Sequence, residues 1–145
     1  MNKRSRRKFL IGGSASLCLA TLNSCNGANQ EDLERRGSAE LMHFSTVPPG
    51  VSLHPVERLV MVRDSNGIGA FSLLCTHQTC LLTQENSGGG FFCPCHGSQF
   101  DKIGRVIAGP AAKDLPWYEL SLLPNGVLQI NFAKHVSSNW RLQIG

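Results

Sequence analysis

The sequence has no long amphipathic helix pattern, no internal repeat and no apolar run of membrane-spanning length. No stretch repeats apolar residues at helical spacing for long enough to form a long helix, so an all-helical fold is excluded. The longest apolar run, residues 9–22, is interrupted by Gly and Ser. A helix over these 14 residues would span about 21 Å, less than the ~30 Å hydrocarbon core of a bilayer. A permanent transmembrane anchor is therefore not favoured.

Positive charge is scarce beyond the first eight residues. Five of the 14 Lys and Arg residues lie within residues 1–8, which contain no acidic residue. The remainder of the chain therefore has nine basic and ten acidic residues. A nucleic-acid-binding protein would need a basic face, so this class is disfavoured. The basic excess belongs instead to a targeting segment.

Residues 1–25 are predicted to be an export signal. Ser5-Arg6-Arg7-Lys8-Phe9-Leu10 and the apolar run after it resemble a bacterial twin-arginine signal, a route that carries folded proteins; a plain basic N-terminus is the alternative. Leu22-Asn23-Ser24-Cys25 resembles a lipoprotein-processing box, although Asn23 departs from it. Cys25 is therefore a lipidation candidate, with cleavage after Ala20 or no cleavage as alternatives. We predict a location in the periplasm or on the outer face of the cytoplasmic membrane.

The rest of the chain divides into a short polar segment and one domain. Residues 26–40 are polar and charged and are predicted to form a flexible tether with one frayed helical turn around residues 31–36. Residues 41–145 are predicted to form an all-β domain, with hairpin turns at Asp64-Ser65-Asn66-Gly67 and Pro124-Asn125-Gly126. The candidate strands are residues 41–47, 56–63, 68–74, 117–123, 127–132 and 140–144.

Six Cys and His residues fall in two short groups within a Gly-rich stretch of irregular pattern, residues 74–111. They are Cys75, His77 and Cys80, then Cys93, Cys95 and His96. Each group offers one Cys–His pair and one spare Cys. Two such pairs can hold a [2Fe–2S] cluster, one iron by thiolates and the other by imidazoles, and the spare cysteines could link the two loops.

This pattern resembles the Rieske iron–sulfur proteins over residues 60–132. The resemblance implies an antiparallel β-sandwich with a loop-built cluster-binding subdomain at residues 74–111. It implies that Cys75 and Cys93 bind one iron, that His77 and His96 bind the other, and that Cys80 and Cys95 form a disulfide. Electron transfer is the implied work, and no catalytic site of the chain's own is expected.

Three further positions resemble features that tune the cluster in this family. Ser98 is the expected hydrogen-bond donor to a bridging sulfide, and Gly109-Pro110 matches a proline loop that covers the cluster. Phe100 stands where quinol-oxidising members often carry a Tyr that bonds to a ligand Cys. Because Phe has no hydroxyl, we expect a reduction potential below the highest Rieske values, yet in the upper half of the range of roughly −150 to +300 mV.

The sequence is compatible with several functions. The resemblance favours the iron–sulfur subunit of a quinol–cytochrome c reductase, with cytochrome b or c subunits as partners and quinol as donor. Gln78-Thr79 departs from the Leu-Gly that is common in those proteins. The alternatives are the small subunit of a periplasmic molybdenum oxidase of the arsenite oxidase type, a free-standing lipoprotein carrier, and a structural zinc module, since zinc accepts a Cys₂His₂ set. The other histidines, His43, His54 and His135, are not expected to be ligands.

Overall fold

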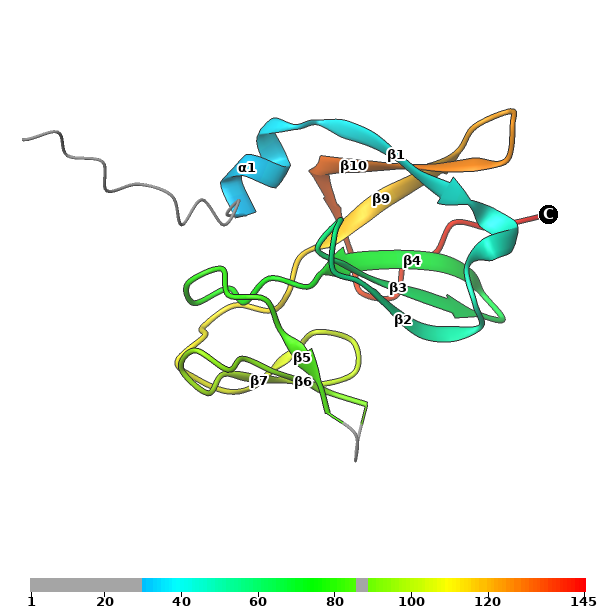
Figure 1. The fold of residues 1–145 in the computed structure, drawn as a ribbon. Coiled ribbons are helices and arrows are strands. Elements are labelled where there is room, and N and C mark those ends of the chain that lie inside the picture. The colour runs from blue at the N-terminus through cyan, green and yellow to red at the C-terminus, as the bar shows by residue number, and fades with distance from the viewer. Residues whose placement is uncertain (1–29, 86–88) are drawn as a thin grey trace, which may run out of the picture.

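The computed structural model describes residues 30–85 and 89–145. The predicted export signal, the lipidation candidate Cys25 and residues 26–29 of the predicted tether lie outside these described residues. Within them, no helix is long and apolar enough to cross a membrane. The prediction of an all-β domain is confirmed, because one short helix precedes ten strands in two antiparallel sheets (Figure 1).

The elements follow one another with short connections. The chain begins with α1 (Gln30–Arg35), and a single 3₁₀ turn (Phe44–Thr46) lies between the first two strands. The strands are β1 (Ser38–His43), β2 (Gly50–His54), β3 (Leu59–Asp64), β4 (Gly67–Ser72), β5 (Thr83–Gln84), β6 (Phe91–Phe92), β7 (Gln99–Phe100), β8 (Val106–Ala108), β9 (Trp117–Leu122) and β10 (Val127–Val136).

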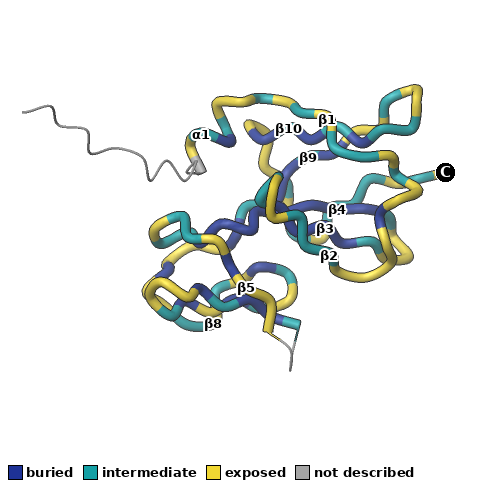
Figure 2. The backbone as a smooth tube through the Cα atoms, in the orientation of Figure 1, coloured by how far each residue is buried: buried dark blue, intermediate teal, exposed yellow. Residues whose placement is uncertain are grey.

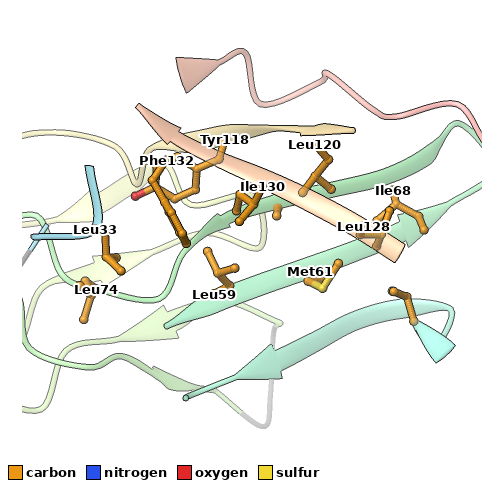
Figure 3. Close-up of a cluster of buried hydrophobic side chains, with 12 residues drawn as sticks. Leu33, Leu59, Met61, Ile68, Leu74, Tyr118, Leu120, Leu128, Ile130 and Phe132 are labelled. Atoms are coloured by element: carbon orange, nitrogen blue, oxygen red, sulfur yellow. The ribbon is translucent and has the colours of Figure 1, made fainter. Parts of the chain in front are cut away.

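The larger sheet has six strands in the order β1-β10-β9-β4-β3-β2 and curls over on itself. Among residues 30–85 and 89–145, the strands of its two halves pair where β4 meets β9, through Ala70–Tyr118 and Phe71–Trp117. The β1-β10-β9 half therefore lies across the β4-β3-β2 half with a buried core between them (Figures 1 and 3). That core contains Leu59, Met61, Ile68, Leu120, Leu128 and Ile130, among others.

The smaller sheet, β5-β6-β7-β8, is inserted between β4 and β9 and forms a separate lobe (Figures 1 and 2). A second buried cluster joins this lobe to the larger sheet, and it includes Cys75 and Cys93, the free cysteines among residues 30–85 and 89–145. The sequence of strand β3 is almost continuously apolar because the strand is buried on both faces. Leu59 and Met61 pack in the core of the larger sheet, whereas Val60 and Val62 pack in the second cluster. A strand buried on both faces has no polar alternation.

The helix α1 belongs to the core although its sequence is polar. Leu33 is 1% exposed and packs in the same cluster as Leu74, the residue immediately before Cys75 (Figure 3). The predicted helical turn near residues 31–36 is present, but it is docked on β10 rather than frayed in a free tether.

Several strand boundaries differ from the sequence prediction. The first candidate, residues 41–47, is instead the end of β1 followed by the 3₁₀ turn, and β2 was not predicted at all. Val56 lies in a turn before β3 and is 86% exposed. The expected edge strand at residues 140–144 is only an isolated bridge between Leu142 and Ile68. Short edge segments carry little periodicity, so sequence patterns define them poorly.

Candidate metal centre

The first of two cysteine loops, residues 75–80, connects β4 to β5 and closes on itself through backbone hydrogen bonds. The N–H of Cys75 donates to the carbonyl of Cys80 at 2.9 Å, and the N–H of Thr79 donates to the carbonyl of Cys75 at 2.8 Å. Thr79 has a φ of 56°, a left-handed conformation that is rare for a β-branched residue. The loop thus presents its side chains from a tight and locally strained turn.

The second cysteine loop, residues 93–98, connects β6 to β7 and repeats this backbone plan. The N–H of Cys93 donates to the carbonyl of Ser98 at 2.8 Å, and the N–H of Gly97 donates to the carbonyl of Cys93 at 2.9 Å. Gly97 occupies the left-handed position, with a φ of 79° that glycine adopts without strain. The two loops are therefore similar in backbone although their Cys and His spacings differ.

A disulfide between Cys80 and Cys95 joins the tips of the loops, and this predicted pairing is confirmed. The sulfur of Cys93 lies close to it: the Sγ atoms of Cys80, Cys93 and Cys95 are all within 4.8 Å of one another. The disulfide consumes two of these sulfurs, so this trio is not itself a metal-binding set. Cys93 is left as a free thiol beside a disulfide.

The two free thiols of the described residues, Cys75 and Cys93, are buried together. Burial raises the pKa of the Cys93 thiol, and the neighbouring Cys75 thiol raises it further. The backbone N–H groups of Cys95 and His96 act in the opposite direction, because they donate hydrogen bonds that favour the Cys93 thiolate. Two buried thiols with backbone donors aimed at one sulfur suit a metal that would hold both as thiolates.

The imidazoles of His77 and His96 meet edge to face on the same side of the lobe. Their ring centroids are 4.9 Å apart and their planes make an angle of 86°. His77 Nδ1 is buried and has no hydrogen-bond partner among the described residues. A buried ring nitrogen without a partner is costly in a protein interior, and a metal ion would supply the missing interaction.

The segment that carries Gly109 and Pro110 lies next to the second cysteine loop. Both residues are exposed, and the peptide bond between them is cis. Ser98 is fully buried, and its Oγ accepts a hydrogen bond of 3.0 Å from the N–H of Ala111, which fixes this segment against the second cysteine loop. Phe100 is 1% exposed and packs in the same buried cluster as Cys93.

Two residues not singled out by the sequence make long-range hydrogen bonds near the site, and one of them, Thr76, ties the first cysteine loop. Thr76 Oγ1 donates a 2.5 Å hydrogen bond to the carbonyl of Lys113, and Trp117 Nε1 donates a 3.0 Å hydrogen bond to the carbonyl of Ile103. Both lie on a cleft of about 720 Å³ that also reaches Cys75. The position of Thr76 between Cys75 and His77 was the available signal. Trp117 carried none, because its partner is distant in sequence.

The remaining histidines of the described residues make contacts away from the two cysteine loops. His43 Nδ1 lies 2.7 Å from Ser45 Oγ, His54 Nε2 lies 3.1 Å from Ser52 Oγ, and His135 Nε2 lies 3.4 Å from Glu34 Oε1.

Comparison with known proteins agrees with this geometry. The family model described as "Rieske [2Fe-2S] domain" matches residues 37–119. Two relatives are a cytochrome b6-f complex iron-sulfur subunit of Prochlorococcus marinus (strain MIT 9215), 38% identical over 71 residues, and cytochrome b6-f complex iron-sulfur subunit 1 of the cyanelle of Cyanophora paradoxa, 44% identical over 71 residues. Each match covers 48% of this chain, and the chain spans 40% and 30% of the respective relatives.

Among solved structures, the cyanobacterial plasma membrane Rieske protein of Synechocystis PCC 6803 matches with a TM-score of 0.42 and 28% identity. The match covers 71% of this chain and 94% of that one.

Proposed function

The chain belongs to the Rieske [2Fe-2S] domain family, its cofactor is a Rieske-type [2Fe–2S] cluster, and from this premise we propose that it transfers single electrons in an exported, membrane-associated respiratory chain. The observation that carries the proposal is the pairing of donors. Two free thiols are buried together, and two imidazoles are in contact, one with a partnerless buried nitrogen. Such a cluster accepts and releases one electron at a potential between roughly −150 and +300 mV.

Each donor pair would hold one iron. Cys75 and Cys93 would bind the inner iron as thiolates, because both sulfurs are buried at the base of the loops. His77 would bind the outer iron through Nδ1, and His96 would complete the pair. His96 is exposed, so its ring would lie at the surface where a redox partner can approach.

The surrounding residues would set the potential. Ser98 accepts a hydrogen bond from Ala111, so its own hydroxyl proton remains available to donate toward a cluster sulfide. The N–H groups of Cys95 and His96 donate to Cys93 and favour the more negative, reduced form. Phe100 supplies no such donor, which supports a potential below the highest of the family.

A structural zinc module fits the donor positions less well. Tetrahedral zinc with two sulfur and two nitrogen ligands would bring all four donor atoms within about 3.3–3.9 Å of one another, given Zn–S and Zn–N bonds of about 2.3 and 2.0 Å. Among the described residues, the trio of donor atoms found within 4.8 Å is the Cys80, Cys93 and Cys95 set, with neither histidine in it. The separated thiol and imidazole pairs suit two irons better than one ion.

The partner is proposed from the relatives and from the exposed tip. The relatives are named as subunits of cytochrome b6-f complexes, so we propose cytochrome subunits as partners and a quinol as electron donor. His96, Pro94 and Pro110 are exposed at this tip and would face the partner. Gln78 is exposed as well, and it would place an amide in the docking surface. Twin-arginine export and lipidation of Cys25 complete the proposal and would hold the domain at the outer face of the cytoplasmic membrane.

The decisive experiment is an EPR-monitored redox titration of the purified full chain, with iron, sulfide and zinc analysis. We expect two irons and two sulfides per chain, a Rieske-type signal and a positive potential that falls at alkaline pH. His77→Ser should abolish the signal, whereas the matched variant His54→Ser should retain it. Stoichiometric zinc without sulfide, in protein never exposed to chelators, would refute the proposal.

The choice of partner needs a separate measurement. Membranes from cells that lack this protein should lose quinol-dependent cytochrome c reduction and regain it when the holoprotein is returned. Intact quinol oxidation without the protein, together with its co-purification with a molybdenum-containing subunit, would move it to the oxidase class.

A further inference from the structure

The free thiol of Cys93 lies beside the disulfide that joins the two cysteine loops. The Sγ atoms of Cys80, Cys93 and Cys95 are mutually within 4.8 Å, although Cys93 belongs to the proposed ligand set and the other two do not. A thiol sulfur at most 4.8 Å from both sulfurs of a disulfide lies close to van der Waals contact with it. Three sulfurs so placed are the reactants of a thiol–disulfide exchange.

We propose that the cluster-free protein rearranges its own disulfide, from Cys80–Cys95 to Cys80–Cys93. The sulfur of Cys93, after losing its proton, attacks Sγ of Cys80. The bond between Cys80 and Cys95 breaks, and the sulfur of Cys95 leaves as a thiolate that takes up a proton. One disulfide and one thiol are consumed and one of each is formed, so neither an oxidant nor a reductant is required.

The surroundings of the three sulfurs select this product. Cys95 is exposed, so its thiolate would be solvated as it leaves, whereas Cys93 is 1% exposed. Attack on Cys95 instead would link Cys93 to Cys95 in a small ring around Pro94, whose φ is fixed. The selected product keeps the two cysteine loops joined, because Cys93 and Cys95 belong to the same loop.

The exchange would act as a checkpoint on cofactor binding, and this consequence rests on the proposed ligand role of Cys93. While Cys93 binds iron, its sulfur is not available for attack and the native disulfide persists. Once the cluster is lost, exchange removes a ligand, and the protein cannot be refilled until a reductant opens the new bond. In an oxidising compartment such a protein would stay inactive.

The test is disulfide mapping of the full chain before and after cluster removal. The cluster is removed with a chelator under anaerobic conditions without added thiol, and the protein is sampled over minutes to hours, the range for uncatalysed rearrangement. Each sample is quenched in acid, alkylated, digested and mapped by mass spectrometry. We expect a Cys80–Cys93 linkage to replace Cys80–Cys95, with Cys75 and Cys95 becoming alkylated. Persistence of Cys80–Cys95 with alkylated Cys93 would overturn the proposal.

Two controls separate native exchange from unfolding. Cys75→Ser keeps all three sulfurs and should still rearrange, whereas Cys93→Ser should retain Cys80–Cys95. A wild-type sample scrambled in concentrated guanidinium gives the random pairings, including those of Cys75. If the cluster-free protein gave those same proportions, the exchange would not depend on the native geometry and the proposal would fail. Absence of iron and sulfide from the protein as isolated would refute the proposed function instead, and the mapping could still be done on that sample.

Discussion

Replacement of Phe100 by Tyr should raise the reduction potential, because it adds a hydrogen-bond donor to the buried cluster that contains Cys93. Phe100 is 1% exposed and is paired across the sheet with Phe91. A hydrogen bond to a charged group is worth about 1.5–3 kcal/mol, but only the difference between the oxidised and reduced states alters the potential. If that difference is about 1 kcal/mol, the shift is about 40 mV, since 59 mV corresponds to ~1.4 kcal/mol for one electron.

The assay is an EPR-monitored titration of both proteins at one pH, paired with urea unfolding. A matched control is Phe91→Tyr, which adds a hydroxyl to the same buried cluster at a ring that meets Phe71 edge to face at 5.5 Å. We expect Phe100→Tyr to raise the potential and to leave stability nearly unchanged. Phe91→Tyr should leave the potential unchanged and lower stability by about 1–3 kcal/mol, the cost of an unpaired buried hydroxyl.

Two results would refute this reasoning. An unchanged potential in Phe100→Tyr would mean that the hydroxyl does not reach a ligand sulfur, or that the bond is equally strong in both redox states. Equal shifts in the Phe100 and Phe91 variants would mean that any added polarity in the buried cluster raises the potential, without a specific bond.

Three further predictions concern stability. Leu33→Ala should lower the free energy of unfolding by about 2 kcal/mol in urea titrations, at the low end for a buried Leu because a terminal helix can shift, whereas the exposed Glu31→Ala on the same helix should change it little. Thr79→Gly should raise it by about 1 kcal/mol, since glycine relieves the φ of 56°, and an unchanged or lower value would argue against strain in the first cysteine loop. Burial raises the pKa of Asp64, but hydrogen bonds from the Asn66 N–H and the Arg141 guanidinium outweigh burial, so its net pKa is lowered. Its stabilisation is therefore present above the unfolded pKa of about 3.9 and is lost as pH falls through the folded value. Because this carboxylate is 36% exposed, Asp64→Asn should cost only about 0.5–1 kcal/mol at pH 7, and the difference should vanish in acid-titrated unfolding curves.

The sequence predicts the strands that bear on the core better than those at the edges. Strands β4 and β9 are recovered within two residues at each end, because their apolar runs are bounded by clear turn residues. Strand β2 is missed because Gly50 and the preceding prolines read as a turn. The docking of α1 could not be predicted either, since a single apolar residue, Leu33, makes the buried contact from an otherwise polar helix.

The metal-binding residues of the proposed centre can be predicted from the sequence, whereas the hydrogen bonds that hold the surrounding segments in place cannot. Cys and His at short spacing are a chemical signal that needs no long-range information. The supporting hydrogen bonds do need it: Thr76 ties the first cysteine loop to Lys113 across 37 positions, and Trp117 reaches Ile103 in the smaller lobe across 14 positions. Such bonds follow from the tertiary arrangement of lobe and sheet, which the local pattern does not encode.

The two cysteine loops share a backbone conformation that their different Cys–His spacings do not indicate. In each loop the first Cys accepts a hydrogen bond from a residue four positions later, and that residue, Thr79 or Gly97, is left-handed. The same turn can therefore present different pairs of positions. The first cysteine loop offers its imidazole two positions after the first Cys and its disulfide sulfur five positions after it. The second offers the disulfide sulfur two positions after the first Cys and the imidazole three positions after it. A search for one repeated Cys–His spacing would miss this relation, because the equivalence lies in the backbone.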